Sequence, residues 1–558
     1  MKSPKNNNRR ALEWIYKNSK KYIPSLALCT FISAVTSVAY VVLAYISSFV
    51  IDIAIGKKQG DIRFYITVLF LLVLIQAVLN VGGSLMSTKV SAKLENSFRL
   101  SFFKNLMQKE YGSISGLHSG DILNRFTSDI DVVVMAVVGV VPGAVSFFAR
   151  LVAAFFVLIS LSRSLGLAVI IIGIIIGVVA RIYSKFVKQI HKQVQEASGN
   201  TRSFMQECTE NVVVVKSFNS SHTFSKKLMD FMQKTYKLKI KRSLIANISN
   251  STKYILFTGG YYAALAFGAF LISGGTMTYG SLLALLNIIS NIRRPLTHMS
   301  GLLPQYYQAL ASAERIMEIE DLPSEKESLP QNEILKIFES FKGISMRDVC
   351  FSYDGQRKIL QGLNLEINRG ELVALVGGSG EGKSTLFRIL LGLYSQNDGE
   401  VVVGADVDYK LDSTLRGLFA YVPQGNLILS GTIGDNIRFC NTTATESEVA
   451  QAAKVADLYD FVSGLPEGFD TVIGERGIGL SEGQLQRISI ARAILSDAPI
   501  LLLDECTSAL DEATEKRVLN NIKEKGNITA ILISHRPAAL KICDKVYAIE
   551  NGIARIEG

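Results

Sequence analysis

The stretch "GELVALVGGSGEGKSTLFRILLGL", Gly370 to Leu393, decides the fold of the second half of the chain. An apolar strand, Leu372 to Val376, leads into a glycine-rich turn with the pattern GxxxxGK[ST], and an apolar helix follows. Glycines let backbone N–H groups close around phosphate oxygens, and the helix N-terminus adds the positive end of its dipole. The spacing therefore predicts a phosphate-binding loop between a strand and a helix of an α/β domain.

The residues of this loop predict a site for ATP with Mg²⁺. Lys383 is expected to reach the β- and γ-phosphates, and the Ser384 hydroxyl is expected to ligate Mg²⁺. Glu381 places a carboxylate in the loop, so its side chain must point outward if only the backbone holds phosphate. The predicted nucleotide-binding residues of this stretch are Gly377, Gly378, Ser379, Gly380, Glu381, Gly382, Lys383, Ser384 and Thr385.

Two later apolar runs end in residues that suit the same chemistry. "PILLLDE", Pro499 to Glu505, predicts a buried parallel strand that delivers Asp504 to the metal, with Glu505 as general base toward water. "ITAILISH" predicts a third strand that ends in His535, a position suited to contact a γ-phosphate. Two solvated acids and a structural histidine are the alternative, which an intact phosphate loop makes the weaker one.

The first half of the chain has a different composition from the second. The chain has 558 residues, which predicts at least two domains, and 48% of them are hydrophobic. Long apolar runs dominate from about residue 22 to 303, and an ordinary α/β pattern begins near residue 345. The predicted spans of a six-helix, all-α membrane domain are 23–47, 64–86, 132–160, 165–184, 254–274 and 278–303.

A buried helical core in a soluble protein is the alternative to these spans. It is disfavoured because "AVIIIGIIIGVVA", Ala168 to Ala180, offers no polar face. The connections 87–131 and 185–253 are long and helical in pattern, which predicts helices that continue far beyond the membrane. Turn chemistry is clear at Tyr111 to Asp121 and weaker at Gln206 to Val212.

The formal net charge of +10 is placed as in a membrane protein. Basic residues precede the first span and gather again between residues 185 and 242, whereas the loop at Ser273 to Gly280 has no charge. Basic loops stay on the cytoplasmic side, so the N-terminus and the second half are predicted to be cytoplasmic. No basic–aromatic interleaving supports nucleic-acid binding, and the six scattered cysteines predict reduced thiols.

Two arginine positions fall inside apolar spans. Arg150 lies in "SFFARLVAAFF", and Arg294 follows Arg293 in "NIRRPLTH". A charge at the centre of a bilayer costs about 2.5–3.5 kcal/mol on the insertion scale, so such residues usually face a bundle interior or a watery cavity. Both are candidates for a substrate cavity. A buried structural pair or snorkelling is the alternative for Arg150, and Arg294 with Pro295 alternatively marks the exit of the last helix from the membrane.

With these residues in place, the chain resembles a half-transporter of the ABC exporter type over nearly its whole length. "LSEGQ" is similar to the family signature LSGGQ, with Glu482 in place of the first glycine, and "TVIGERG", Thr471 to Gly477, resembles a loop of exporters. The signature residues are Leu480, Ser481, Glu482, Gly483 and Gln484. The resemblance assigns adenine stacking to Tyr353, Mg²⁺ contact and sensing to Gln424, a D-loop to Asp511 and a switch role to His535.

The resemblance implies how the signature works without a local partner. In such proteins ATP lies between the phosphate loop of one chain and the signature of another, so a second half-transporter is required. A homodimer is favoured here because all site motifs are present, and a heterodimer remains open. Ser481 opens a helix whose N-terminus suits a γ-phosphate presented by the second molecule, and Glu482 places a carboxylate near that position.

The function implied is ATP-driven export of a lipid, peptide or drug-like molecule by alternating access, in a bacterial cell membrane. A nucleotide-gated regulator or channel on the same scaffold is the alternative. The turns near 113–121 and 204–213 resemble coupling helices. The expected domains are a basic lead-in helix at 1–21, the membrane domain at 22–320, a linker at 321–341 and the nucleotide-binding domain at 342–558.

Overall fold

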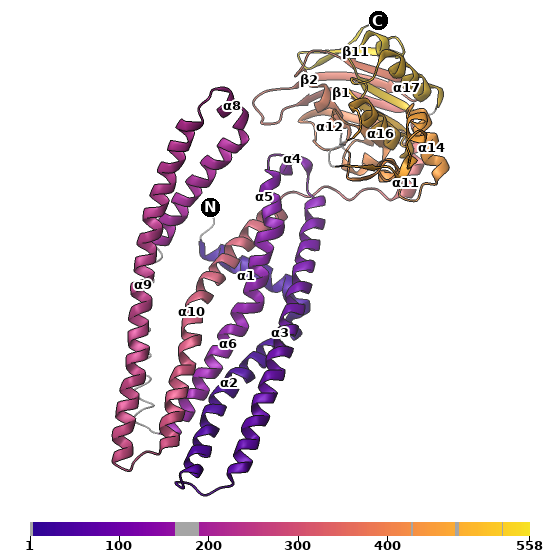
Figure 1. The fold of residues 1–558 in the computed structure, drawn as a ribbon. Helices are drawn as coiled ribbons and strands as arrows, with labels where there is room; N and C mark the ends of the chain where they lie inside the picture. The colour runs from indigo at the N-terminus through magenta and orange to yellow at the C-terminus, as the bar shows by residue number, and fades with distance from the viewer. Residues whose placement is uncertain (1–3, 162–188, 426–427, 475–478, 527, 558) are drawn as a thin grey trace. The chain divides into compact units, whose positions relative to one another are not determined.

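The computed structural model describes residues 4–161, 189–425, 428–474, 479–526 and 528–557 (Figure 1). The chain divides into two compact units. The first consists of Met1–Lys104 and Gly120–Glu320, and the second consists of Asn105–Ser119 and Asp321–Gly558.

The first unit is helical throughout its described secondary structure. Residues 189–210 are also helical and lead into a turn at Asn211. The helices are α1 (Pro4–Ser19), η1 (Lys20–Tyr22), α2 (Ile23–Ala54), α3 (Ile62–Met107), α5 (Ser119–Asn124), the π-helix η2 (Arg125–Asp129), α6 (Ile130–Leu161), α8 (Val212–Ser217), α9 (Ser221–Ser273) and α10 (Tyr279–Glu320).

Two of these helices are much longer than a membrane is thick. Helix α3 has 46 residues and α9 has 53, which at 1.5 Å per residue is about 69 and 80 Å. The hydrocarbon core of a bilayer is only about 30 Å thick. The predicted extension of helices beyond the membrane is therefore confirmed for both.

Four described segments are long and apolar enough to cross a membrane: Asn7–Ala54, Ile62–Met107, Ser119–Leu161 and Ser221–Ser273. They contain the predicted spans 23–47, 64–86 and 132–160, and all but the last residue of 254–274. All but the first residue of the predicted span 278–303 falls in α10, whose described apolar part, Tyr279–Asn291, is shorter. The predicted span 165–184 lies outside the described residues.

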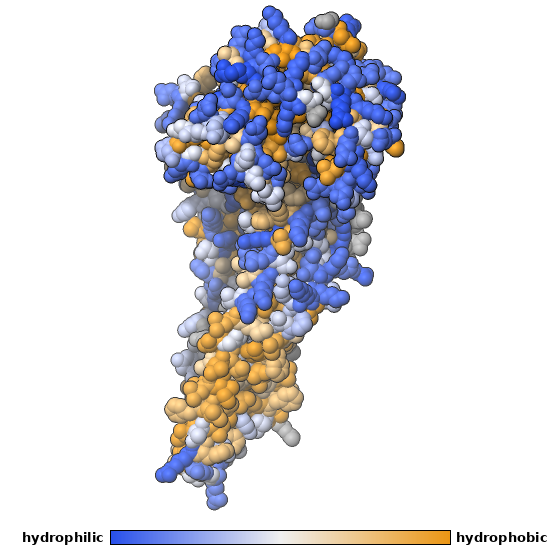
Figure 2. All heavy atoms as spheres, turned by 90° about the vertical axis from the view of Figure 1, so that its right-hand side faces the viewer, coloured by the Kyte–Doolittle hydropathy of each residue, from blue (hydrophilic) through white to orange (hydrophobic). Residues whose placement is uncertain are grey.

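On the face shown in Figure 2, hydrophobic side chains gather over the helices in the half that adjoins the α2–α3 turn. On α3, Phe70 and Val78 are each 70% exposed. Such a large apolar surface is unfavourable in water and matches the acyl chains of a lipid bilayer.

Helices α2, α6 and α10 pack side by side in the first unit (Figure 1). Their common core includes Val41 and Ala44 from α2, Ala154 from α6, and Leu285 and Ile288 from α10. Small side chains at such contacts let helix backbones approach closely. Among the described helices of this unit, these three make the most extensive contacts with one another.

Asp52 ties the end of α2 to the start of α10. It is fully buried, and its carboxylate accepts hydrogen bonds from Thr278 Oγ1 (2.8 Å) and the Gly280 amide (2.9 Å). Lys58 Nζ lies 3.4 Å from the same carboxylate. A Cβ on Gly280 would lie 2.2 Å from the Ser48 carbonyl oxygen, so only glycine fits here.

The segment "GDILNRFTSDID", residues 120–131, makes a second set of ionic contacts at the start of α6. Asp129, 2% exposed, accepts hydrogen bonds from Ser312 Oγ (2.9 Å) and Arg315 Nε (2.9 Å). Arg125 pairs with Asp121 at 2.9 Å and Glu318 at 3.1 Å. These residues therefore hold η2 against the last part of α10.

The second unit is an α/β domain built on a six-stranded sheet with the order β12-β11-β3-β10-β9-β6. Strands β11, β3, β10, β9 and β6 are parallel, and β12 pairs antiparallel with β11. The strands are β3 (Leu372–Val376), β6 (Phe419–Val422), β9 (Ile500–Asp504), β10 (Thr529–Ile533), β11 (Lys545–Glu550) and β12 (Ile553–Glu557). The three strands predicted around the site are thus confirmed.

An antiparallel sheet with the order β2-β1-β4-β5 and a short pair, β7 with β8, complete the strands. They are β1 (Gly343–Phe351), β2 (Leu360–Asn368), β4 (Asp398–Gly404), β5 (Tyr409–Lys410), β7 (Gly431–Thr432) and β8 (Val472–Ile473). The helices are α4 (Tyr111–Ile114), α11 (Gln331–Ser340), α12 (Lys383–Leu390), η3 (Ser413–Leu418), α13 (Ile433–Ile437), η4 (Arg438–Cys440), α14 (Glu446–Val455), α15 (Tyr459–Ser463), η5 (Gly468–Asp470), α16 (Glu482–Leu495), α17 (Glu512–Glu524) and α18 (Pro537–Leu540).

The central strands are buried on both faces, as their continuous apolar runs predict. Along β9, Ile500 and Leu502 pack in the core formed with the antiparallel sheet and α12. Leu501 and Leu503 pack in the core formed with α14, α16 and α17. Successive side chains of one strand therefore hold two layers together.

Residues 321–341, the expected linker, contain α11 and belong to the second unit. Ile337 and Phe341 are each 2% exposed within one of its cores. Arg416 makes two hydrogen bonds of 2.9 Å with the carboxylate of Glu325. This segment has the contacts of a structural part of the domain.

The segment around α4 joins the start of this unit. Lys109 Nζ donates to the Leu322 carbonyl (2.8 Å) and to Ser324 Oγ (3.0 Å), and the Glu325 amide donates to the Gln108 carbonyl (2.8 Å). The first expected coupling turn therefore contains α4. At the second, a turn at Asn211 and the start of α8 at Val212 lie within the expected range, and a reversal at Asn219, with a φ of 49°, follows α8.

Candidate nucleotide site

The phosphate loop depends on glycine at two positions in particular. Gly377 has a φ of 146°, and a Cβ there would lie 2.4 Å from the Ile549 carbonyl oxygen. Gly382 has a φ of 99°, and a Cβ would lie 2.8 Å from Leu360 Cδ2. Because L-residues rarely adopt these angles, the loop shape follows from its sequence.

Lys383 is folded back onto its own loop. Its ammonium donates to the carbonyl oxygens of Gly377 (2.7 Å) and Gly378 (2.8 Å), and the residue is 7% exposed. Burial lowers the pKa of Lys383, and the charges of Glu505 and Asp504 oppose that effect. The lysine is therefore at the loop, where a phosphate would replace the two carbonyls as its partner.

Glu381 points away from the loop interior. Its Oε2 accepts a hydrogen bond of 2.6 Å from the Asn551 amide, in the turn between β11 and β12. The orientation expected for this carboxylate is confirmed. The backbone of the loop keeps its capacity to bind phosphate.

Asp504 ends β9 directly beside Ser384. Ser384 Oγ donates to Asp504 Oδ1 at 3.4 Å, and the Tyr421 hydroxyl donates to Asp504 Oδ2 at 3.2 Å. Burial raises the pKa of Asp504, and these two hydrogen bonds oppose the shift. A hydroxyl and a carboxylate so placed form an oxygen set of the kind that binds Mg²⁺ together with nucleotide phosphates.

Glu505 follows with a backbone φ of 48°, and its carboxylate accepts a hydrogen bond of 2.7 Å from Gln424 Nε2. Gln424 lies two residues after β6, and His535 lies two residues after β10 with an exposed side chain. Since β3, β6, β9 and β10 are parallel, their carboxyl ends share one edge of the sheet. That edge is where such sheets bind ligands.

Tyr353 is 47% exposed and is held by residues of the loop helix. Its hydroxyl shares a hydrogen bond of 3.0 Å with Thr385 Oγ1 and accepts one of 3.0 Å from Arg388 Nη1. The ring of Tyr353 meets Phe351 edge-on, with 4.9 Å between centroids. The residue predicted to stack on adenine thus has a fixed orientation beside the phosphate loop.

Tyr394 connects Tyr353 to the segment around α4. Its ring is edge-on to Tyr353 at 5.1 Å between centroids and edge-on to Tyr111 at 5.7 Å. The Tyr394 hydroxyl shares a hydrogen bond of 3.0 Å with Ser115 Oγ. A Cβ on Gly112 would lie 3.1 Å from the Tyr394 ring, which leaves little room for another residue.

The signature forms the start of α16. The Ser481 side chain accepts from the Gln484 amide (3.3 Å), and the Gln484 side chain accepts from the Ser481 amide (2.8 Å), which is a capping box. Glu482 is the first residue of the helix and is exposed. Leu480 packs at the edge of the core that contains α16.

A cavity of about 400 Å³ lies between the signature and the D-loop. Ser481, Glu482 and Gly483 line one side, and Ala509, Leu510 and Asp511 line the other. None of the residues that line it belongs to the phosphate loop. The structure therefore groups the predicted site residues into two separate sets, one around Lys383 and one around Ser481.

The D-loop is clamped from two sides. Gln486 of α16 donates to Ser508 Oγ (3.2 Å) and accepts from the Ala509 amide (3.1 Å). Arg536, next to His535, donates to the Ser508 (2.5 Å) and Leu510 (2.6 Å) carbonyls. Asp511 caps α17 through a bond of 2.9 Å from the Thr514 amide, which lowers the pKa of Asp511.

Several of these contacts were not identified from the sequence. Tyr421 lies two residues after Phe419 in β6, so both side chains are on the same face of the strand. This spacing could have identified Tyr421 from the sequence. No pattern in the local sequence predicts the contacts of Tyr394, Gln486 and Arg536. Of the two arginines predicted in the membrane part, Arg150 is half-buried, and Arg294 lies in α10 with a side chain outside the described part.

Family models and related proteins match both halves of the chain. The model for the ABC transporter transmembrane region matches residues 26–296, and the ABC transporter model matches residues 360–508. The chain is 28% identical to an ATP-dependent lipid A-core flippase of Desulfotalea psychrophila, over 99% of this chain and 96% of that protein. It is 32% identical to a putative export ATP-binding/permease protein of Rickettsia felis, over 86% and 84%.

A solved structure has the same fold. The structure of a bacterial Atm1-family ABC exporter with ATP bound superposes with a TM-score of 0.77, at 23% identity. The match covers 96% of this chain and 94% of that one.

Proposed function

The chain belongs to the ABC transporter family and is an ATP-driven exporter, and from this we propose which residues drive its cycle and what it moves. It is an integral membrane protein with ATPase activity coupled to transport. A nucleotide-gated channel is not favoured, because relatives that match most of the chain include a flippase and an export protein.

The proposed site roles follow the edge of the parallel sheet. Residues Gly377 to Thr385 hold the phosphates, and Tyr353 stacks on the adenine. Glu505 accepts a proton from the attacking water, and His535 contacts the γ-phosphate. The observation that supports these roles most is the convergence of the phosphate loop, Asp504, Glu505 and Gln424 on one edge of the sheet.

We assign Mg²⁺ to Ser384, Asp504 and Gln424. The donors fit, because Mg²⁺ is usually held by one or two carboxylates plus substrate phosphates and water. No cluster of three His, Cys, Asp or Glu side chains occurs among the described residues, so a cage supplied by the protein alone is not found there. When bound, Mg²⁺ neutralises charge on the phosphate oxygens.

Two chains are proposed to form two ATP sites. The cavity beside Ser481 has helix N-terminal amides but no phosphate loop, and the loop at Lys383 lacks the signature, so each set would complete the other on a second molecule. A homodimer is favoured because one chain has both sets. The Asp511 D-loop, clamped by Gln486 and Arg536, would then lie at the contact between the molecules.

The proposed membrane unit has six spans, with residues 165–184 as the fourth, and covers 22–320 after a lead-in at 1–21. We place the nucleotide-binding domain at 342–558 with 321–341 as its connecting segment. We propose that the chain lies in a bacterial cell membrane. Basic residues before α2 support a cytoplasmic location for the N-terminus and the nucleotide site. Closure of the two ATP sites on ATP binding, and their opening after hydrolysis, would drive alternating access.

A lipid-like amphiphile is the proposed substrate. Proteins named for the lipid A core are among the relatives from three bacteria, at 26–29% identity. Arg150 and Arg294 are proposed to face its path. Peptides and drug-like molecules are the competing classes.

The test is transport in vesicles that contain the purified full chain. Fluorescent phospholipid on the nucleotide side should move to the other leaflet with Mg·ATP, and Lys383→Ala should move none. Steady ionic current with intact ATPase and no movement of lipid, peptide or dye would overturn the exporter assignment.

A further inference from the structure

Arg150 carries a charge in the membrane part of α6, and its partners are neutral. Its guanidinium donates to Ser37 Oγ of α2 and to the Asn291 carbonyl of α10, each at 3.3 Å. The guanidinium carbon lies 4.9 Å from the centre of the Tyr40 ring. Its Nε is buried and has no hydrogen-bond partner among the described residues.

The membrane segments offer no carboxylate to this arginine. Within the described residues no ion pair to Arg150 occurs. Between residues 14 and 94 the acids are Asp52 and Asp61, and neither 132–195 nor 231–313 contains any Asp or Glu. The same ranges include the stretches outside the described residues, and a second identical chain would bring only the same few acids.

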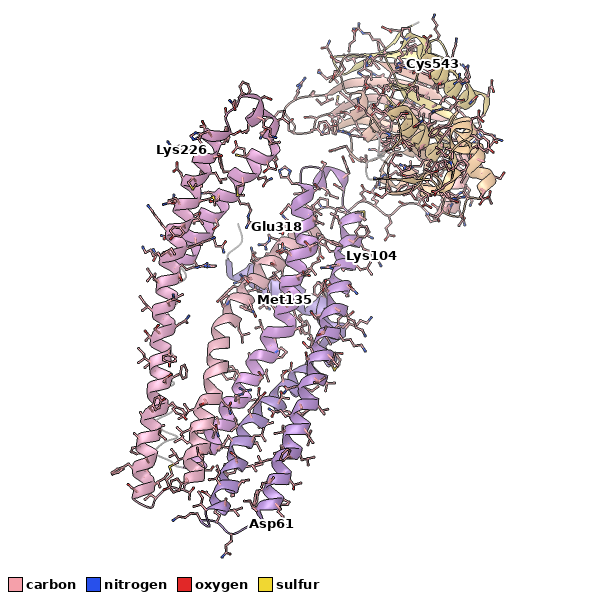
Figure 3. All side chains as sticks on the ribbon, in the orientation of Figure 1. Asp61, Lys104, Met135, Lys226, Glu318 and Cys543 are labelled. Carbon is pink, nitrogen blue, oxygen red and sulfur yellow. The ribbon has the colours of Figure 1, made fainter. Side chains whose placement is uncertain are left out.

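The nearest acids along the helices are distant and already engaged. Asp52 lies 15 residues beyond Ser37 on α2, about 22 Å away at 1.5 Å per residue, and binds Thr278, Gly280 and Lys58. Asp131 lies 19 residues before Arg150 on α6, about 28 Å away, and pairs with Arg99. Asp61 lies at the α2–α3 turn, at the end of the helices away from Lys104 and Glu318 (Figure 3).

An aromatic cavity lies near the same stretch of α10. It has a volume of about 220 Å³ and is lined by Tyr254, Phe257, Tyr261 and Tyr262 of α9 with Ile289 and Ser290 of α10. Ser290 directly precedes Asn291, which accepts a hydrogen bond from Arg150. The cavity on α10 is therefore next in sequence to the carbonyl that accepts a hydrogen bond from Arg150.

We propose that Arg150 binds the anionic headgroup, a phosphate or carboxylate, of the amphiphile that this chain transports. An intramembrane cation without a counter-ion is costly, and a ligand anion removes that cost. A planar guanidinium also binds such groups through two parallel hydrogen bonds. The weak bonds to Ser37 and Asn291 would orient the side chain, and the aromatic cavity would take apolar parts of the ligand. The inference rests on the exporter function proposed above.

The test compares lipid binding and lipid response in the full chain. The purified protein is examined by native mass spectrometry after exposure to equal amounts of phosphatidylglycerol and phosphatidylcholine. Its ATPase rate is then measured in vesicles of phosphatidylcholine with and without phosphatidylglycerol. The wild type should retain the anionic lipid in excess and respond to it, and Arg150→Gln should lower that preference roughly tenfold.

Three further arms separate the explanations. Arg99→Gln removes an arginine that is paired with Glu95 and Asp131, and the lipid preference should stay as in wild type. Arg150→Lys keeps the charge and should keep part of the preference, whereas a purely structural role would make it as deficient as Arg150→Gln. Inorganic phosphate should not reproduce the response, since a free anion lacks the apolar part.

A wild type without preference for phosphatidylglycerol in both readouts would overturn the proposal. So would an Arg150→Gln protein whose preference is unchanged, or an equal response to inorganic phosphate. ATP hydrolysis and lipid movement in phosphatidylcholine vesicles test the exporter function separately. A negative result for headgroup binding by Arg150 can therefore be told apart from a negative result for the exporter function.

Discussion

The side-chain amide of Gln424 donates a hydrogen bond of 2.7 Å to Glu505 Oε2. The two residues follow β6 and β9, which pair in register from Phe419 with Ile500 to Val422 with Leu503. The Glu505 amide also donates to the Ile533 carbonyl of β10 at 3.2 Å. The sheet therefore sets both the position and the direction of this carboxylate.

Glu505→Gln should lower the turnover of ATP at least about 100-fold and leave ATP binding intact, because an amide cannot accept the proton from water. Stalled ATP-bound dimers should accumulate. Turnover is measured by phosphate release, binding by nucleotide titration, and dimers by crosslinking. Normal hydrolysis in this variant would show that Glu505 is not the base.

Tyr394→Leu should weaken ATP binding, because Tyr394 packs edge-on against Tyr353. Aromatic pairs contribute about 0.5–1.5 kcal/mol beyond area burial, so the dissociation constant for ATP should rise roughly two- to tenfold. The effect should fall on KM more than on kcat. Tyr459→Leu is the matched control, since Tyr459 contacts Phe469 elsewhere in the unit, and its ATP binding should match the wild type. Equal loss in both variants would contradict the role of Tyr394.

Glu482→Gln should strengthen ATP-driven pairing of two chains, because Glu482 lines the cavity into which a γ-phosphate would enter. Removal of one charge facing a phosphate contributes on the order of 1 kcal/mol near solvent. The ATP concentration for half-maximal pairing should therefore fall several-fold at low salt, and the gain should shrink at high salt. The melting temperature should fall slightly, since an acid at a helix start is stabilising.

Glu512→Gln is the control for that charge change. Glu512 is the exposed first residue of α17 and does not line the cavity. It should show the same small loss of stability and no change in pairing. Weaker pairing in the Glu482→Gln protein would mean that this carboxylate helps to hold the two molecules together.

Asp504 should make the apoprotein less stable as pH rises through the acidic range. Its pKa is raised by burial, so the folded state keeps a proton that the unfolded state has already lost. Stability therefore falls from the ordinary aspartate range up to the raised pKa and is level above it. Without Mg²⁺, Asp504→Asn should be more stable than the wild type above that window and equal below it, in thermal unfolding. A difference that is constant with pH would contradict this assignment.

The parts of the fold predicted from the sequence are those with a pattern in the local sequence. The strand Leu372–Val376 and the strand Ile500–Asp504 follow from continuous apolar runs, and the extensions of α3 and α9 follow from helical pattern without a break. The grouping of α4 with the nucleotide-binding unit depends on the bonds of Lys109 to Leu322 and Ser324. Such contacts join residues more than 200 positions apart, and no local period encodes them.

The candidate site shows the same division. Lys383, Ser384 and Asp504 were identified because motif spacing determines their chemistry. The bond of Tyr421 to Asp504 and the contacts of Tyr394 arise only when distant strands and turns meet. The direction of Glu381 was the intermediate case, since the loop excluded an inward side chain but only the fold supplied Asn551 as its partner.

Each half of the proposed composite site contains a polar group that is bonded inside the single chain. Lys383 occupies its own loop carbonyls, and Ser481 and Gln484 satisfy each other's amides. The phosphates of ATP must first replace these internal bonds. We therefore expect ATP binding to precede the pairing of two chains.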